Sequence, residues 1–472
     1  MNPIQMLFIR VGVRDTAQPH VSPPMGLLCL AAYLREHFAI NVRIIDQREQ
    51  NCSVPQLARM TADFGPDIVG ISSVSASSYV IPDLTRAIRE AFPKALIVLG
   101  GPHSSAIGEA ALEDNQADMS VTGEGELVLE QIVRTWRDTG DYSSIPGLIW
   151  RSPDRQIIKN PGTFSFIGDL TTLPLPAYDL IDIRKYWDLH SFVLVPHRKY
   201  ISIMTSRGCP FQCNYCHKIF GKHFRALPAE RVVNEIEYYV KTYGVEDIEF
   251  LDDIFNLDYD RAIEVCEMLQ AKNLGVKLSF PNGLRTDALS EELIEAMVDA
   301  GFYYASFALE SGSPRLQKLM GKNLDIPSFL RNVEIATNKG VFGNGFAMMG
   351  FPTETREEMQ QTTDVMCESR MHTAQFFTVT PFPGTALYEE VARTAPEKLR
   401  ELDLANSTFG RVRINLSAEP DKVLFACQRK ANRRFYMNPS RILRLLRDHP
   451  APQYFPLYVP MFLEKVTKGI FS

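Results

Sequence analysis

The sequence predicts an α/β protein in three parts: an N-terminal doubly wound, Rossmann-like sheet, a partial (β/α)6 TIM-type barrel and a small helical C-terminal region. Two series of alternating strand-like and helix-like segments predict the sheet and the barrel, because parallel strands need crossover helices. A chain of 472 residues is also too long for one hydrophobic core. We place the parts at residues 1–140, 197–395 and 396–472, with a connector at 141–196.

The N-terminal part contains apolar, strand-like runs at 4–9, 41–46, 67–73, 95–99 and 117–121. Ligands of a doubly wound sheet bind in the loops that follow the carboxyl ends of its strands. Glycine in such a loop lets the backbone approach a large ligand closely, although ordinary strand–helix turns use the same small residues. The candidate binding residues are Ser72, Ser73, Ser75, Gly100, Gly101, Pro102, His103, Gly123 and Glu124.

Prolines punctuate the connector, and short strand-like pieces at 148–151 and 156–159 predict a small hairpin within it. A second series of strands, separated by amphipathic helices such as 228–243, predicts the barrel. In barrels of this type the reactive groups lie at the carboxyl ends of the strands. The predicted barrel strands are 200–206, 247–251, 277–281, 303–309, 343–349 and 375–380.

Three cysteines, Cys209, Cys213 and Cys216, lie in the loop after the first barrel strand with C-x3-C-x2-C spacing. Thiolates are soft ligands that hold iron–sulfur clusters. Three thiolates leave one iron of a four-iron cluster open, which indicates chemistry rather than electron storage alone. The alternative is a structural zinc site, but such a site needs four ligands, and the adjacent His217 is sterically a poor fourth ligand.

With Tyr215 before the last cysteine, this motif resembles the signature of the radical S-adenosylmethionine (SAM) enzymes. The resemblance implies a [4Fe-4S] cluster on the three cysteines, whose fourth iron chelates the amino and carboxylate groups of SAM. It also implies an external one-electron reductant, such as flavodoxin or ferredoxin, and cleavage of SAM to a 5′-deoxyadenosyl radical.

Polar residues at the other barrel strand ends resemble the SAM-binding elements of this family. The resemblance implies an aspartate for the SAM ammonium, an arginine for its carboxylate and a glutamate for the ribose hydroxyls. The residues alone also allow one aspartate to cap a helix, and Arg285 to pair with Asp287. The candidate SAM-binding set is Tyr215, Asp252, Asp253, Asn282, Arg285, Glu310 and Gly350.

The N-terminal part carries a second resemblance, to the cobalamin-binding domain that precedes many radical SAM barrels. It rests on residues 24–34, Asp46, 100–103 and 123–126. The D-x-H-x-x-G motif, which places a histidine under cobalt in related domains, is absent from the sequence. The resemblance therefore implies cobalamin whose own base is displaced and is not replaced by a protein histidine.

The overall composition, 45% apolar and 22% charged, is that of a soluble globular protein. A net charge of −6 leaves no basic surplus for nucleic-acid binding. No apolar run reaches the roughly 18 residues that span a bilayer, and residues 1–13 lack the features of a signal peptide. Eight cysteines without a regular disulfide framework predict a cytoplasmic protein.

The C-terminal part is predicted to form helices at 397–404, 422–436 and 439–448, followed by an aromatic run at 454–462. One interpretation is a helical cap that packs its aromatic side chains on the barrel. The other is contact with a membrane surface, with basic side chains at anionic headgroups. The basic residues in question are Arg429, Lys430, Arg433 and Arg434.

Together the resemblances imply a cobalamin-dependent radical SAM enzyme with a small-molecule or lipid-like substrate between the cysteine loop and loops 72–78 and 100–103. The commonest such reaction methylates an unactivated carbon: the deoxyadenosyl radical abstracts hydrogen, and the substrate radical takes methyl from methylcobalamin, which a second SAM remakes. The alternative is a radical cyclase or rearrangement enzyme without methyl transfer, such as the anaerobic Mg-protoporphyrin monomethyl ester cyclase. A corrinoid-binding sensor or carrier is a remote alternative, against which the intact cysteine triad argues.

Overall fold

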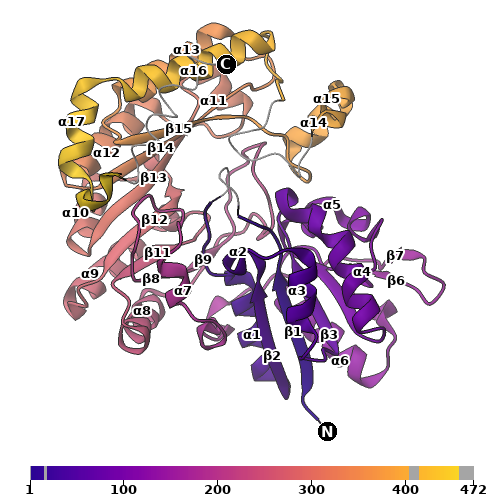
Figure 1. Ribbon diagram of the computed structural model, residues 1–472. Helices are drawn as coiled ribbons and strands as arrows, with labels where there is room; N and C mark the ends of the chain where they lie inside the picture. Colours follow the sequence, from indigo (N-terminus) through magenta and orange to yellow (C-terminus); the bar gives the residue numbers. More distant parts are fainter. Residues whose placement is uncertain (1, 15–18, 403–413, 457–472) are drawn as a thin grey trace.

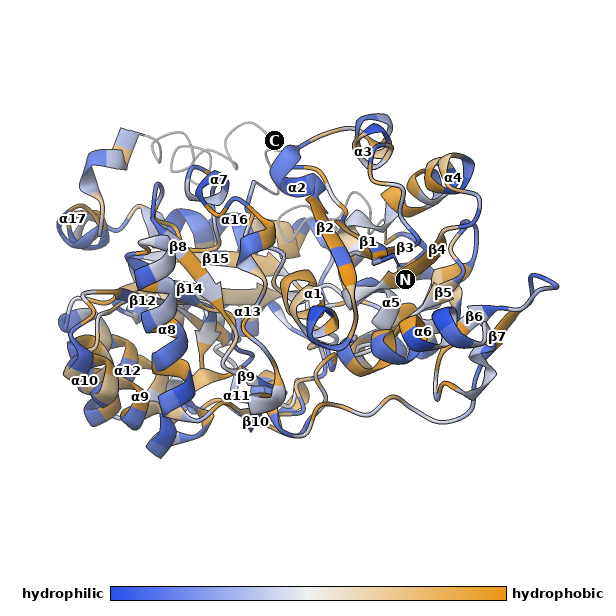
Figure 2. Ribbon diagram, turned by 90° about the horizontal axis from the view of Figure 1, so that it is seen from below, coloured by the Kyte–Doolittle hydropathy of each residue, from blue (hydrophilic) through white to orange (hydrophobic). Residues whose placement is uncertain are grey.

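The computed structural model describes residues 2–14, 19–402 and 414–456. Two sheets dominate it, one in the N-terminal part and one built from strands between residues 200 and 378 (Figure 1). Hydrophobic residues occupy the strands and the helix sides that face them, and hydrophilic residues lie on the outer sides (Figure 2). Within the described residues, we find no helix whose length and apolar content would allow it to cross a bilayer.

The N-terminal sheet has seven strands in the order β2-β1-β3-β4-β5-β6-β7. The first five are parallel, and the hairpin β6–β7 continues the sheet in antiparallel pairing. The strands are β1 (Ile4–Arg10), β2 (Ile40–Asp46), β3 (Ile68–Ser72), β4 (Leu96–Gly100), β5 (Met119–Ser120), β6 (Ile149–Arg151) and β7 (Ile157–Lys159).

Helices cover both faces of this sheet, as a doubly wound fold requires. One apolar cluster joins a face to α1 (Met25–His37) and α6 (Glu126–Asp138). A second cluster joins the other face to α3 (Val54–Thr61) and α4 (Ile81–Ala91). The remaining helices of this part are the short α2 (Gln47–Gln50) and α5 (Gly101–Ile107).

Two details of the N-terminal part differ from the sequence-based expectation. The predicted hairpin forms, but β6 pairs with β5, so the first part of the connector belongs to the sheet. Residues 101–103, expected in a loop, begin helix α5, because Pro102 fits the first turn of a helix, where its missing N–H is not needed.

The second sheet has six parallel strands in the order β15-β14-β13-β12-β11-β8. Because β8 and β15 are both edges, the barrel is partial. The strands are β8 (Tyr200–Ile203), β11 (Asp247–Phe250), β12 (Lys277–Leu284), β13 (Phe302–Glu310), β14 (Phe342–Met349) and β15 (Thr373–Thr378). The helices that follow them include α8 (Ala229–Tyr243), α9 (Tyr259–Lys272), α10 (Glu291–Asp299), α11 (Pro314–Leu319), α12 (Ile326–Asn338) and α13 (Arg356–Glu368).

The first barrel strand ends earlier than predicted. It stops at Ile203, and a separate two-stranded ribbon forms from β9 (Ser206–Arg207) and β10 (Arg225–Ala226). The residues between the two ribbon strands, 208–224, contain all three motif cysteines. We call this segment the cluster loop; the ribbon is its base.

The C-terminal part is helical, with α14 (Ala386–Thr394), α15 (Pro396–Arg400), α16 (Asp421–Tyr436) and α17 (Pro439–Asp448). Tyr436 of α16 bonds through its hydroxyl to both backbone groups of Ala374 in β15, so α16 covers the edge strand of the barrel. Tyr454 packs in an apolar cluster with Val193 and Tyr304, as a cap would. The rest of the aromatic run, 457–462, lies outside the described residues.

These observations confirm the predicted fold class, a doubly wound sheet followed by a partial parallel barrel and a helical end.

Candidate active site

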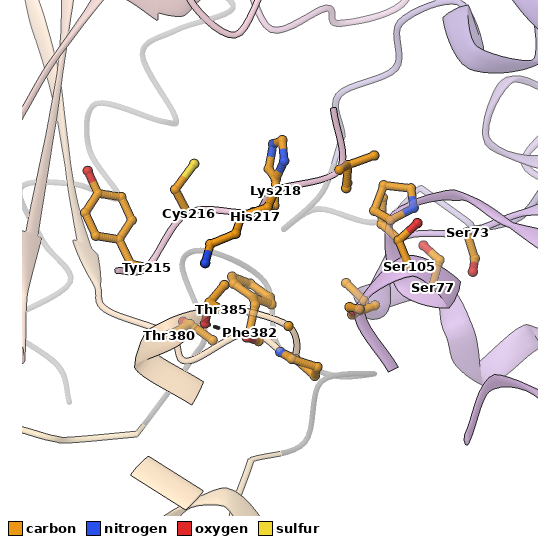
Figure 3. A pocket seen from close by; sticks show the side chains of 18 of the residues that line it. Ser73, Ser77, Ser105, Tyr215, Cys216, His217, Lys218, Thr380, Phe382 and Thr385 are labelled. Carbon is orange, nitrogen blue, oxygen red and sulfur yellow. Dashed lines mark hydrogen bonds between the residues drawn. The ribbon is translucent and has the colours of Figure 1, made fainter. Parts of the chain in front are cut away.

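A cleft of about 2600 Å³ lies between the N-terminal sheet and the barrel. Figure 3 shows Tyr215 and Cys216 on one side of it and Ser73, Ser77 and Ser105 on the other. Pockets for single drug-sized ligands measure about 300–1,000 Å³. The cleft therefore has room for more than one large molecule, and the carboxyl ends of the strands of both sheets open into it.

The backbone of the cluster loop is held from both sides. At its base, Gly208 has a φ of +86°, and a Cβ there would collide with the carbonyl oxygen of His223. At its tip, the Asn214 amide donates to Met320 O (2.9 Å), and the Leu387 amide donates to Asn214 O (2.8 Å). These contacts fix the path of the segment that carries the cysteines.

The three cysteines are free and partly buried. Burial, together with the neighbouring Cys213, raises the pKa of the Cys216 thiol to about 12. A cationic cluster is needed to hold such a group as a thiolate. Within the described ranges, no three His, Cys, Asp or Glu side chains converge on a single ion position. A four-iron cubane gives each thiolate a separate iron, so the soft donors on this loop fit a cluster better than a lone metal ion.

The two aspartates after β11 have different surroundings. Asp252 is buried and accepts hydrogen bonds from Thr205 N (3.2 Å), Thr205 Oγ1 (2.8 Å) and Ser206 Oγ (2.5 Å). Asp253 faces the cluster loop: burial raises the pKa of its carboxyl, and the nearby His217 and the Gly208 amide oppose the rise. Neither caps the next helix, because Asp258 caps α9. Neither aspartate is among the residues that line the described cleft, and Asp253 is the less buried of the two.

Arg285 adopts the second of the two alternatives that the residues allowed, pairing with Asp287, and it lies outside the described cleft lining. Its guanidinium forms a two-point ion pair with Asp287 (2.9 and 3.0 Å). The same group stacks over the ring of Phe211 in the cluster loop, with 3.8 Å from Cζ to the ring centroid. Asn282, in the same strand end, lines the cleft and donates to Leu251 O (2.8 Å). The arginine therefore braces the cluster loop, and the asparagine faces the open space.

Glu310 and Tyr215 both line the cleft, and Glu310 is held in a strained conformation. Its φ of +65° is uncommon for a residue with a Cβ, and such strain gathers at functional sites. Lys322 lies 3.4 Å from its carboxylate. Gly350, in contrast, is not part of the described cleft wall, and its amide donates to the buried carboxylate of Glu354.

On the N-terminal wall, the cleft is lined by six of the nine candidate residues: Ser72, Ser73, Ser75, Pro102, Gly123 and Glu124. Gly100, Gly101 and His103 are not among the residues that line it. Gly101 has a φ of +86°, and a Cβ there would stand 2.7 Å from Ser72 Oγ. The His103 ring is 3.2 Å from Ser75 Oγ. Gly101 and His103 therefore both support the loop at 72–78, which we call the serine loop.

Glu124 occupies a different role from the one its position in the sequence suggested. Its carboxylate is 6% or less exposed and binds Arg225 at 2.7 and 3.1 Å. It also accepts the Ile167 amide (2.9 Å). Both carboxylate oxygens are therefore occupied by contacts between the N-terminal part, the connector and the cluster-loop base.

Several cleft residues were not predicted from the sequence. Lys218 and His217 follow the last cysteine and project into the cleft (Figure 3). Arg429 reaches it from α16, and Phe346 and Phe377 pair their rings across neighbouring strands (5.8 Å). His20 also lines it, with its Nδ1 2.8 Å from Ser191 O. Proximity to the cysteine motif was a usable signal for Lys218; the others depend on tertiary structure.

Comparisons with known proteins agree with this arrangement. Residues 203–366 match the Radical SAM superfamily, and residues 15–133 match the B12 binding domain. The chain is 31% identical over 431 residues to an uncharacterized methyltransferase of Pyrococcus horikoshii, covering 90% of each chain. It is 26% identical to the anaerobic magnesium-protoporphyrin IX monomethyl ester cyclase of Rubrivivax gelatinosus, covering 89% of this chain and 74% of that protein.

Two solved structures share the fold. The radical SAM methyltransferase TsrM of Kitasatospora setae, with cobalamin and a [4Fe-4S] cluster bound, has a TM-score of 0.67 at 18% identity and covers 84% of this chain and 78% of its own. The cobalamin-dependent SAM radical enzyme OxsB has a TM-score of 0.74 at 15% identity and covers 97% of this chain and 72% of its own. The chain therefore belongs to the cobalamin-dependent radical SAM methyltransferase family and is an enzyme that uses a [4Fe-4S] cluster, SAM and cobalamin.

Proposed function

We propose that the enzyme methylates an unactivated carbon of a small-molecule or lipid-like substrate held in the cleft. The observation that carries this proposal is the composition of the cleft wall: Tyr215 and Cys216 of the cluster loop and the serine loop after β3 border the same volume. Reacting atoms must approach within roughly 3–3.5 Å. A single cleft bordered by both cofactor regions allows a substrate to touch both.

The residues of the barrel wall have proposed roles toward SAM and the cluster. Cys209, Cys213 and Cys216 would hold the cluster, and Asp253 would accept the SAM ammonium. Asn282 and the strained Glu310 line the cleft where a nucleoside with ribose hydroxyls would lie. When bound, the cofactors supply a one-electron radical initiator and a transferable methyl group; the chain's own residues orient them and exclude water.

The N-terminal wall is proposed to hold cobalamin. Its serines and glycines offer hydroxyls and backbone, with little side-chain bulk, to a large ligand. In the TsrM and OxsB structures cobalamin is bound to proteins of the same fold. We propose domain limits near 140, 196 and 395, with the connector hairpin β6–β7 (149–159) extending the sheet of the first domain.

Partners and location are also proposals. A one-electron donor such as flavodoxin or ferredoxin would reduce the cluster. All eight cysteines are free, as expected in a reducing cytoplasm. Contact with a membrane surface through α17, whose Leu443 and Leu446 are 67% and 51% exposed, would bring a lipid-like substrate within reach.

Product stoichiometry tests the reaction. Anaerobic turnover with labelled SAM and the true substrate should give 5′-deoxyadenosine and S-adenosylhomocysteine in equal amounts, because one SAM initiates and a second supplies methyl. A relative named as a cyclase makes a reaction without methyl transfer the second candidate. That reaction would form deoxyadenosine without stoichiometric S-adenosylhomocysteine, and this result would exclude methylation by this route.

A further inference from the structure

Four charged residues form a buried network where the N-terminal domain meets the base of the cluster loop. Glu124 lies in the turn between β5 and α6, and Glu126 is the first residue of α6. Arg207 and Arg225 are the two ribbon residues that flank the loop. All four are only 3–6% exposed. The network therefore joins the cobalamin domain to the segment that carries the cluster cysteines.

Each carboxylate holds one arm of the ribbon. Arg207 Nη2 donates to Glu126 Oε1 (2.7 Å), and Arg225 Nη2 donates to Glu124 Oε1 (2.7 Å). Glu124 also stands 3.5 Å from Arg207 Nη1, so it faces both arms. The cost of burying four charges is offset only when their geometry is well matched. Such a network fixes the separation and orientation of the two arms.

The connector completes this junction. Arg225 donates to Ile167 O (2.6 Å) and to Phe220 O (2.8 Å), and its guanidinium lies over the ring of Phe166 (5.2 Å). The Phe166 ring is packed so closely that a Cβ at Gly221 would stand 3.0 Å from it. Three separate parts of the chain thus meet at the end of the cluster loop.

Displacement of the ribbon would be transmitted to the cysteines. Arg207 is two residues before Cys209, and the intervening Gly208 has no free space at its Cβ position because His223 fills it. On the other side, Gly123 belongs to the same turn as Glu124, lines the cleft, and donates its amide to Ser105 Oγ (3.0 Å) on the cobalamin wall. One short turn therefore contacts both cofactor regions.

We propose that Glu124 and Glu126 are positioning residues that fix the position of the cluster loop relative to the cobalamin domain. Their carboxylates touch no reacting atom; they act through Arg207 and Arg225. Seating of cobalamin against the 123–126 turn and ordering of the cluster loop are then coupled, and each favours the other.

Hydrogen exchange of the full-length, cluster-loaded protein tests this role without relying on any catalysed reaction. In the wild type, peptides covering 208–224 should exchange slowly, and hydroxocobalamin should slow them further. In Glu126→Gln and Glu124→Gln the same peptides should exchange about tenfold faster or more, since local opening sets the rate. Glu130→Gln is the matched control, because Glu130 is on the same helix and pairs with Arg134 instead.

A double variant separates positioning from simple stability. Glu126→Gln leaves buried Arg207 with only its longer contact to Glu124 (3.5 Å) and should lower the melting temperature. Glu126→Gln combined with Arg207→Gln removes both charges and should restore most of it. The proposal requires that the double variant still exchange rapidly at 208–224 and show an altered EPR spectrum of its reduced, SAM-bound cluster. Wild-type exchange and spectrum in the double variant, or in both single variants, would overturn it.

Discussion

The two walls of the cleft are built from different kinds of residue. The barrel wall presents large or charged side chains, among them Tyr215, Lys218 and Glu310. The N-terminal wall presents small ones after β3 and in α5, among them Ser73 and Ser105, and Arg10, Arg48 and Tyr79 line the cleft beside them. A wall of small residues leaves space and backbone groups for one large, rigid ligand. A wall of larger groups can bind a ligand by individual ion pairs and stacking, and can activate it.

The walls are nevertheless fitted to one another. Gly384, in the turn after β15, is so close to the N-terminal domain that a Cβ there would stand 3.0 Å from Ala106 Cα. The difference between the walls therefore predicts that substitutions on one wall should mainly weaken binding of the cofactor on that wall. Binding of the other cofactor should change less, through the coupling at the 123–126 turn. The following predictions test this separation.

The largest effect is expected at the barrel wall, for Cys213→Ala. Two thiolates are too few to hold a cubane with an open iron, so the variant should lose both its iron and its cleavage of SAM. Cobalamin uptake should stay near the wild-type level. Iron analysis and 5′-deoxyadenosine assay check this, with the buried core residue Cys266→Ala as control. Full iron content in Cys213→Ala would contradict the cluster assignment.

The matching experiment on the other wall is Gly101→Ala. The added Cβ would approach Ser72 Oγ to 2.7 Å and the Ser73 backbone to 3.1 Å, at a φ that disfavours it by about 1–3 kcal/mol. The serine loop must shift, so uptake of hydroxocobalamin should fall about tenfold while the iron content is unchanged. At Gly100 a Cβ meets nothing within 4 Å, and Gly100→Ala should fold normally. Unchanged uptake of hydroxocobalamin in Gly101→Ala would show that the serine loop does not bind cobalamin.

A smaller effect should distinguish the neighbours Asp252 and Asp253. Asp252→Asn weakens a buried set of three hydrogen bonds and should lower the free energy of unfolding by about 1–3 kcal/mol. Asp253→Asn should leave stability nearly unchanged and weaken SAM binding about tenfold, because a charge-assisted hydrogen bond is lost. Urea unfolding and equilibrium dialysis measure the two quantities. If Asp252→Asn weakens SAM binding and Asp253→Asn lowers stability instead, Asp252 is the aspartate that binds SAM.

The sequence was sufficient for the parts of the site that are contiguous in the chain. The cysteines lie within eight residues, so their spacing alone indicates a cluster. The strand ends could be found because parallel strands place their carboxyl ends at one edge. The parallel strands of both sheets and the long amphipathic helices were predictable for the same reason, namely that their apolar periodicity is local, whereas short helices such as α2 and α5 were not.

Side-chain direction was not predictable, because it depends on partners distant in the sequence. Asp252 is turned toward Thr205 and Ser206, 47 and 46 residues away, while its neighbour faces the cluster loop. Glu124 looked like a cofactor contact, but it pairs with Arg225, 101 residues later. The pairing of β6 with β5 likewise depends on an open sheet edge that no local pattern reveals.

A smaller effect is expected for Glu354, whose buried carboxyl accepts the backbone amides of Gly350 and Phe351 after β14. Burial raises the pKa of its carboxyl from 4.5 to about 7. A carboxyl whose pKa is raised in the folded state stabilises the fold at pH values below its unfolded-state pKa. This contribution, here about 3 kcal/mol, is lost as the pH rises through 7. Glu354→Gln should therefore gain stability relative to the wild type between pH 5 and 8. The free energy of unfolding of both proteins is measured with urea across that range. If the two values change in parallel with pH, Glu354 is not a buried, protonated carboxyl.

The smallest expected effect concerns the histidines near the N-terminal wall. His103 is bound to Ser75 and is not among the residues that line the cleft, and His20 faces the cleft with its Nδ1 near Ser191 O. Because neither stands in a D-x-H-x-x-G context, we expect EPR of Co(II)-cobalamin on the protein to lack nitrogen superhyperfine splitting. His103→Ala and His20→Ala should then leave the spectrum unchanged. If splitting appears and disappears in one variant alone, that histidine is the cobalt ligand, and the N-terminal wall supplies a charged or coordinating group after all.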